Sequence, residues 1–405
     1  MDELGPRMRP EPGRDAVLDG GASAPILPLL AGYWSFGQYW GVWVILVFEY
    51  QRFHGIGDAR LGLLYTSLSV VAVVVMLLIA PRLQPLALRT SVTLSLLTLT
   101  VASLAIGFLP GSVVVVGFML VGAGNGLIDV YLNVAAQRAE VLSKKPVLQW
   151  LHASYALGGA TGAAAAALVR VLDLDFRWGF VYASVALAAT GIWNAATASR
   201  ERGPEGTETS LSVSALFRTP ALWIPALAVL FAFLVEGSMD TWSGLYLRDG
   251  LGASATTAAA AFIAFSGAIF FGRLFAGRVL FGLGSRTTIL VSGIGSGIAG
   301  SVAILTTNPW VVGLAFLLLG FSISAAAPAG FGLTEAIDED PTNAIAAVTT
   351  VGYSGFIWSP PLLGWIAQTV DLRAAMAVIV VGTFGLVVVG YLAPRDAPAR
   401  VARRS

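Results

Sequence analysis

Three carboxylate side chains lie inside long apolar stretches of the sequence: Asp129, Glu236 and Asp240. Asn125 and Asn133 flank Asp129 at intervals of four residues, so a helix would place all three on one polar stripe. A low-dielectric environment disfavours the charged form of a carboxyl group, which lets the group take up and release a proton near neutral pH. The pattern indicates proton-coupled chemistry or solute binding at Asp129, although hydrogen bonds between helices would explain the asparagines equally well.

Glu236 and Asp240 are also four residues apart and would share one helix face. Two carboxyl groups one turn apart in a low dielectric cannot both ionise cheaply, so we expect one of them to be neutral and assign that role to Glu236. A weak internal repeat places Gln38 over Glu236, and both are expected to face a common cavity. A structural hydrogen bond between helices is the alternative interpretation for each.

Aromatic and histidine side chains form a second group of candidates. Trp34 would share a helix face with Gln38, and the repeat places Tyr155 over Tyr353. Aromatic faces stack on sugar rings or amphipathic ligands, but they also fill cores and interfacial belts. His152 is expected near the depth of the polar stripe, where it either partners that stripe or supports a helix contact. We include all four side chains in the predicted substrate and proton site.

Composition limits the classes of function. Of 405 residues, 56% are hydrophobic and 12% are charged, and that charged share is about half the usual one for a soluble domain. These values exclude a disordered chain, a nucleic-acid binder and an ordinary soluble enzyme. The chain has no cysteine and two histidines, which excludes thiol catalysis and His-rich or Cys-ligated metal sites. Since nucleotide-binding, nucleophile-elbow and zinc-protease motifs are also absent, we expect no enzymatic activity, metal or cofactor.

Apolar stretches long enough to cross a bilayer recur along the whole chain. We predict twelve membrane-spanning helices, at 25–49, 60–80, 90–108, 112–137, 147–169, 177–198, 220–246, 255–276, 287–306, 309–333, 343–368 and 373–393. The first 24 residues contain no apolar run, so we interpret them as a tail rather than as a cleavable signal peptide.

The distribution of Lys and Arg predicts the orientation in the membrane. With the N-terminus in the cytoplasm, the cytoplasmic segments hold 18 of these bases and the opposite side holds 6. This asymmetry predicts a multi-pass protein of the cell (inner) membrane with both termini cytoplasmic. The longest internal polar stretch then divides the chain into an N-terminal tail, a first bundle, a linker, a second bundle and a C-terminal tail, at 1–24, 25–198, 199–219, 220–393 and 394–405.

The two halves match weakly at an offset of 196–198 residues, for example 118–122 over 316–320. Parallel six-helix repeats imply a cavity between the halves at mid-membrane. The small-residue pairs Gly37/Gly41 and Gly158/Gly162 indicate close helix contacts. The predicted fold is therefore an all-α membrane protein whose twelve helices form two pseudo-symmetric six-helix bundles.

This organisation resembles the major facilitator superfamily. The segments most similar to bacterial transporters related to fucose permease are 122–133 (GAGNGLIDVYLN), 151–159 (LHASYALGG), 236–243 (EGSMDTWS) and 351–364. The resemblance runs over nearly the whole chain from about residue 30 and implies the major facilitator fold. It makes Asp129 the proton-coupling or substrate-binding acid, with Asn133 four residues further on. Arg273 and Arg278 match the basic loop signature of the second half.

These patterns predict a secondary active transporter that works by alternating access, coupled to protons as a symporter, for the uptake of a small sugar-like or amphipathic solute. Efflux of a drug or metabolite is the alternative within the same class, and a transport-dead membrane sensor is the alternative outside it. The expected partners are the solute, protons and the lipid bilayer, without nucleic acid. The protein is expected to be a monomer.

Overall fold

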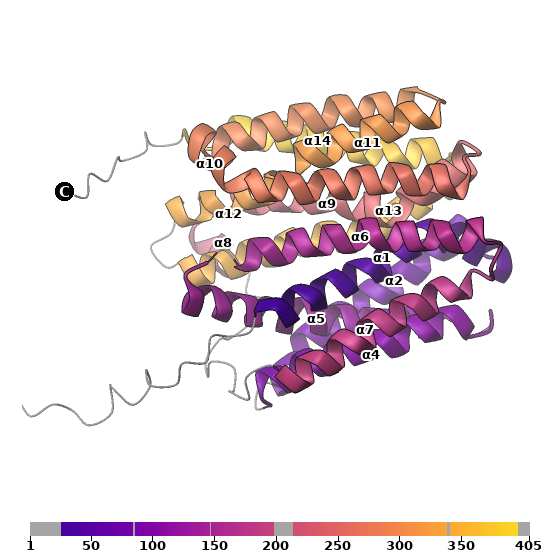
Figure 1. Ribbon diagram of the computed structural model, residues 1–405. Helices are drawn as coiled ribbons and strands as arrows, with labels where there is room; N and C mark the ends of the chain where they lie inside the picture. Colours follow the sequence, from indigo (N-terminus) through magenta and orange to yellow (C-terminus); the bar gives the residue numbers. More distant parts are fainter. Residues whose placement is uncertain (1–25, 84–85, 146, 198–213, 338–340, 396–405) are drawn as a thin grey trace, which may run out of the picture.

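A computed structural model describes residues 26–83, 86–145, 147–197, 214–337 and 341–395, and within these ranges the regular elements are helices without any strand (Figure 1). The long helices run side by side. The first half, indigo to magenta, lies on one side and the second half, salmon to yellow, on the other. The N-terminal tail, most of the predicted linker and the residues after 395 lie outside the described ranges.

The described part of the first half contains six helical units of membrane-spanning length. They are α1 (Ile26–His54); a unit made of α2 (Asp58–Val74), the π-helical segment η1 (Val75–Ile79) and α3 (Ala80–Leu83); α4 (Leu88–Phe108); α5 (Val114–Ser143); α6 (Val147–Val171); and α7 (Arg177–Thr197).

The described part of the second half begins with the short α8 (Ser214–Arg218) and then has six further units. They are η2 (Pro220–Leu222), α9 (Trp223–Leu245) and η3 (Tyr246–Gly250) in one unit; the two parts of α10 (Ala255–Leu305); α11 (Pro309–Ile323) with α12 (Ala326–Ile337); α13 (Pro341–Thr369); and α14 (Leu372–Leu392). Gly284 divides α10, because its φ of 76° and ψ of 165° reverse the chain at a conformation that only glycine adopts freely.

The twelve units correspond one to one to the twelve predicted spans. Eight of the described helices are long and apolar enough to cross a membrane by composition alone, and α10 counts once among them although it contains two spans. The helices α1, α6 and α13 are outside this set. These three helices contain more polar, small and aromatic residues, so their mean hydropathy is lower.

Glycines bring α1 and α6 into backbone contact. A Cβ atom on Gly37 or on Gly41 would lie 2.1 Å from a carbonyl oxygen of α6, and for Gly37 that oxygen belongs to Tyr155. Gly158 and Gly162 on α6 meet the backbone of α1 in the same way. The predicted close contact is confirmed. It fixes the side chains of α1 and α6 relative to one another beside the cavity described below.

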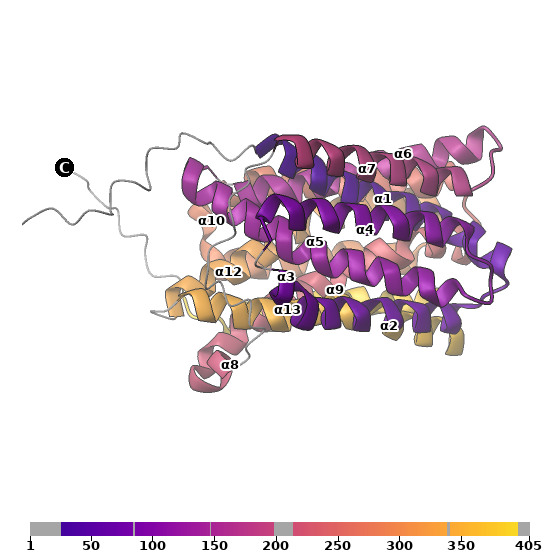
Figure 2. The same ribbon diagram turned by 90° about the horizontal axis from the view of Figure 1, so that it is seen from below.

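The main contacts between the two halves are made by three helix pairs: α6 with α10, α2 with α13, and α1 with α9. The start of α1 and the short α8 lie at one end of the molecule, here called the α8 end (Figure 1, Figure 2). The turn between α1 and α2, residues 55–57, lies at the opposite end, here called the turn end. The functional side chains are distributed between these two ends.

Candidate functional site

A cavity of about 420 Å³ lies between the two halves and is within the size range of sites for small organic ligands. The first half contributes α1, α2, η1, α5 and α6 to its wall, and the second half contributes α9, α10 and α13. Its aromatic lining residues are Tyr33, Phe36, Trp40, Tyr65, Tyr155, Phe233, Tyr353 and Phe356. Its charged or amide-bearing lining residues, with the one histidine, are Asn125, Asp129, His152, Glu236, Asp240 and Arg273. Both halves must therefore be in place for the site to exist.

Glu236 on α9 forms an ion pair with Arg273 on α10. The guanidinium Nη2 lies 2.7 Å from Glu236 Oε2, and both side chains are buried. Nη1 of the same guanidinium donates to the backbone carbonyl of His152 at 3.2 Å, which ties α10 to α6. The guanidinium therefore supplies a counter-charge for Glu236 within the cavity wall. The structure thus gives Glu236 a basic partner, which argues against the expectation that Glu236 is the neutral member of its pair with Asp240.

Asp240 lies one turn from Glu236 and faces a different partner. Its Oδ2 accepts a hydrogen bond from the hydroxyl of Tyr155 on α6, at 3.1 Å. No base lies within ion-pair distance of Asp240 among the residues that the structure describes. The contact joins the two halves through a neutral donor, which leaves the carboxylate without a counter-charge.

Asp129 on α5 faces the cavity, and within the described ranges its carboxylate makes no hydrogen bond or ion pair. Asn133 does not line the cavity, and its Nδ2 donates to the backbone oxygen of Asp129 at 2.6 Å. Asn125 lines the cavity, and its buried Oδ1 has no hydrogen-bond partner in the described part of the chain. Two members of the predicted stripe thus reach the cavity, and the third donates to the backbone of its own helix.

His152 lines the cavity with its ring packed edge-on against Tyr33, at 5.5 Å between ring centroids. Tyr155 and Tyr353, the pair matched by the internal repeat, line the cavity from opposite halves. Among the described residues, no group of three or more His, Asp or Glu side chains is placed to hold a metal ion.

Gln38 and Trp34 do not line the cavity. Gln38 is fully buried, and its side-chain oxygen accepts a hydrogen bond from Tyr182 on α7, so the expectation that it faces the cavity is wrong. Successive residues of a helix are rotated by about 100°. The face of α1 at the cavity therefore carries Tyr33, Phe36 and Trp40 instead.

Arg273 is the main functional residue that the sequence analysis missed. The sequence pattern places Arg273 among the cytoplasmic bases and in a loop signature, but α10 continues through it to Gly284 and its side chain is buried in the cavity wall. The sequence signal for a buried position is that Arg273 lies within the otherwise apolar run 268–276. An arginine in such a run needs a buried partner.

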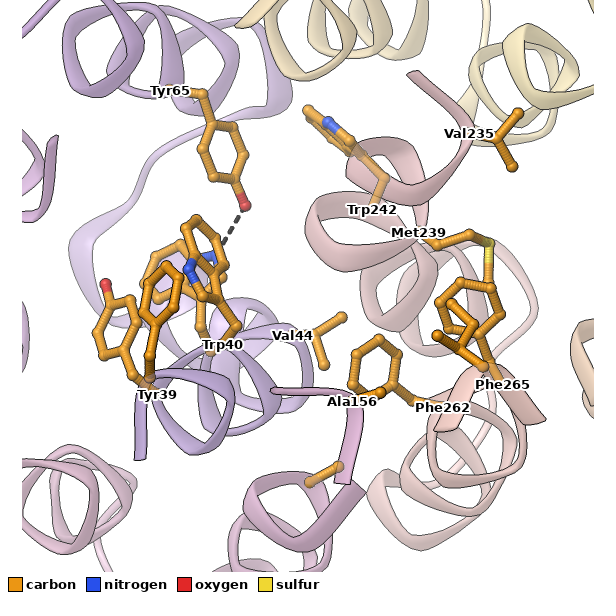
Figure 3. Close-up of a cluster of buried hydrophobic side chains, with 14 of the residues drawn as sticks. Tyr39, Trp40, Val44, Tyr65, Ala156, Val235, Met239, Trp242, Phe262 and Phe265 are labelled. Atoms are coloured by element: carbon orange, nitrogen blue, oxygen red, sulfur yellow. Dashed lines mark hydrogen bonds between the residues drawn. The ribbon is translucent and has the colours of Figure 1, made fainter. Parts of the chain in front are cut away.

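Aromatic and backbone contacts between the halves close the turn end of the cavity. Trp43 Nε1 donates to the Tyr65 hydroxyl at 2.7 Å, and that hydroxyl donates to the Thr241 carbonyl of α9 at 3.2 Å. Figure 3 shows Tyr65 and Trp242 facing each other from the two halves. A Cβ atom on Gly244 would lie 1.7 Å from the carbonyl oxygen of Val44, so these backbones touch. The two halves are therefore in direct contact on the turn-end side of the cavity.

An ion cluster lies beyond this layer, nearer the turn end. Glu49 on α1 pairs with Arg248 of η3 at 2.8 Å and with Arg170 at the end of α6 at 3.3 Å. The Arg248 guanidinium also lies over the Phe48 ring, 4.5 Å from its centroid. Because Glu49 and Arg248 belong to different halves, the pair holds the turn end together.

Comparisons with known proteins agree with this architecture. Residues 16–360 match the Major Facilitator Superfamily. An uncharacterized MFS-type transporter of Yersinia pestis is 28% identical over 330 residues, which cover 80% of this chain and 84% of the relative.

Two solved structures share the fold at low sequence identity. One is a bacterial homologue of the human lysosomal transporter Spinster, in an inward-facing and unoccupied conformation, with a TM-score of 0.72, 14% identity, and coverage of 92% of this chain and 98% of the other. The other is the Escherichia coli fucose:proton symporter, with a TM-score of 0.63, 13% identity, and coverage of 92% and 99%.

Proposed function

Because this chain belongs to the Major Facilitator Superfamily, we propose that it is a proton-coupled secondary transporter that carries a small organic solute by alternating access. The observation that supports this most directly is the cavity between the halves, which holds carboxylates at membrane depth and is sealed at the turn end. Rocking of the two halves would close the α8 end and open the turn end around the same cavity.

Asp129 and Asp240 are the side chains that we propose to carry protons. Both line the cavity, and neither has a basic partner among the described residues. Glu236 is held by Arg273, so its proposed role is to fix that guanidinium in the wall between α9 and α10. Protonation of an unpaired acid removes its charge, and this lowers the cost of closing a dry cavity around it.

The proposed location is the inner membrane, with the α8 end in the cytoplasm and the protein as a monomer. Burial of Arg273 removes one base from the 18 counted on the cytoplasmic side. The count on the opposite side remains at 6, so the asymmetry keeps its direction. The domain boundaries at 199–219 remain a prediction, since only the part from Ser214 onward is described.

A relation to the fucose permease group remains part of the proposal. The motifs at 122–133 and 236–243 lie in the cavity wall, and aromatic faces in that wall suit a sugar ring. Efflux of a drug or metabolite is the second candidate, favoured by the number of aromatic side chains in the same wall.

Purified protein in liposomes that contain a pH-sensitive dye would test transport directly. Solutes are added outside, and those that move with or against protons change the internal pH. We expect a response to at least one solute class that is lost in Asp129→Asn. If no solute moves protons and none accumulates under an imposed pH gradient, the sensor alternative is favoured instead.

A further inference from the structure

We propose that the solute is a protonated amine, held between Asp129 and Asp240 inside the aromatic cavity. This inference rests on the proposed transport function and names the class of substrate for the same site.

The charges of the cavity wall do not balance. Three carboxylates line it, and Arg273 is the one Lys or Arg side chain of the described residues that does so. That guanidinium already binds Glu236 at 2.7 Å and the His152 carbonyl at 3.2 Å. Asp129 and Asp240 are therefore left without a base, and a ligand that brings a positive charge would supply what the wall lacks.

The carboxylates in the cavity wall can accept further hydrogen bonds but cannot donate any. An ionised carboxylate only accepts hydrogen bonds and has about four acceptor positions. Asp240 uses one of them, for the Tyr155 hydroxyl, and Asp129 uses none. Glu236 is 6% exposed, and its Oε1 also lacks a partner within the ranges that the structure describes. An ammonium group offers three donors and no acceptor, so its chemistry is complementary to this set.

The aromatic side chains surround the same space from both halves. Tyr33 and Tyr155 lie 6.5 Å apart between ring centroids in the first half. In the second half, Phe233 lies 4.7 Å from Phe356 and 5.6 Å from Tyr353. Ring faces attract a cation that has lost its water, and they also cover the hydrocarbon part of an amine. A neutral solute would use the rings but would leave two acids without a counter-charge.

Protons and the amine would compete for the same acids. When the ammonium binds, a protonated carboxyl group releases its proton to the aqueous phase and the ammonium takes its place. The ionisable side chains facing this exchange are Asp129, Asp240, Glu236, Arg273, His152 and the tyrosines at 33, 65, 155 and 353. Such competition predicts antiport, in which the amine and protons cross the membrane in opposite directions, rather than symport.

Matched probes that differ in charge test the inference. Purified full-length protein in detergent is heated with glucosamine, glucose and glucuronate, and with 2-phenylethylamine, 2-phenylethanol and 3-phenylpropionate. We expect a rise in Tm with amines alone. The affinity for the amines should fall about tenfold or more when the pH is lowered through the range in which carboxyl groups titrate. It should fall by about as much in Asp129→Asn and in Asp240→Asn. Asp173→Asn, an exposed acid outside the cavity, should bind as the wild type does.

Each contrary outcome has a definite meaning. The inference is overturned if a neutral or anionic probe binds as well as its amine, if no amine binds, or if both Asn variants keep wild-type affinity. Liposome flux separates this inference from the proposed function. Amines that bind but are not transported would support the inference and contradict transport, whereas proton-linked flux of a neutral solute would support transport and overturn the inference.

Discussion

At the scale of single residues, Asp129 combines exposure to the cavity with the absence of any structural hydrogen bond from its carboxylate in the described ranges. Replacing it with Asn removes the charge and the exchangeable proton but keeps the shape. We expect proton-linked flux to fall about tenfold or more, the size of losing one charge-assisted contact. The Tm should stay close to wild type, because no contact of the folded protein is lost.

The matched control for this variant is Asp173→Asn, which changes an exposed acid between α6 and α7. Both variants would be measured in the same liposome assay. Normal proton-linked flux in Asp129→Asn would remove Asp129 from the site.

The Glu236–Arg273 pair leads to a different prediction, because both side chains are buried and in contact. Glu236→Gln leaves a buried guanidinium without its counter-charge, which costs about 3–5 kcal/mol of unfolding free energy. We expect a clear fall in Tm. The double variant Glu236→Gln/Arg273→Gln should recover much of this loss, since it removes both charges. Thermal unfolding in detergent measures both variants, and an unchanged Tm in the single variant would show that the pair does not stabilise the fold.

At the scale of helices, the sequence predicts spans well because each span needs about 20 consecutive apolar residues, a length that buried helices of soluble proteins rarely reach. It is harder to predict which face of a helix lines the cavity, because an error of one residue rotates the expected face by about 100°. The step from Trp34 to Tyr33 is such a case: the first lies outside the cavity and the second lines it. Arg273 was missed for another reason, since a base near the predicted end of a span at residue 276 satisfies a loop signature and a buried ion pair equally well.

Backbone contact between α1 and α9 is the structural basis of the closed turn end. A methyl group on Gly244 would lie 1.7 Å from the Val44 carbonyl oxygen, so Gly244→Ala cannot retain this contact. We expect the variant to favour the conformation that is open at the turn end. A cysteine at Ser69, in the cavity wall of this cysteine-free chain, should then react faster with a maleimide supplied from the turn end.

Gly267→Ala on α10 is the control for this substitution, because a Cβ atom there meets nothing within 4 Å. It should leave labelling of the Ser69 cysteine unchanged. Equal labelling rates in the two alanine variants would mean that the α1–α9 contact does not set the conformation.

At the scale of the whole molecule, alternating access gives the two ends different roles, so the direction of the chain in the membrane decides which way solute and protons move. The absence of cysteine allows both ends to be probed by one kind of substitution. Ser112 is exposed in the turn between α4 and α5 at the turn end, and Ser210 belongs to the predicted linker, outside the described residues. With the α8 end in the cytoplasm, Ser112→Cys should react with a membrane-impermeant maleimide in intact cells. Ser210→Cys should react only after permeabilisation, and the reverse pattern would place the sealed end of the cavity in the cytoplasm and invert the proposed direction of proton movement.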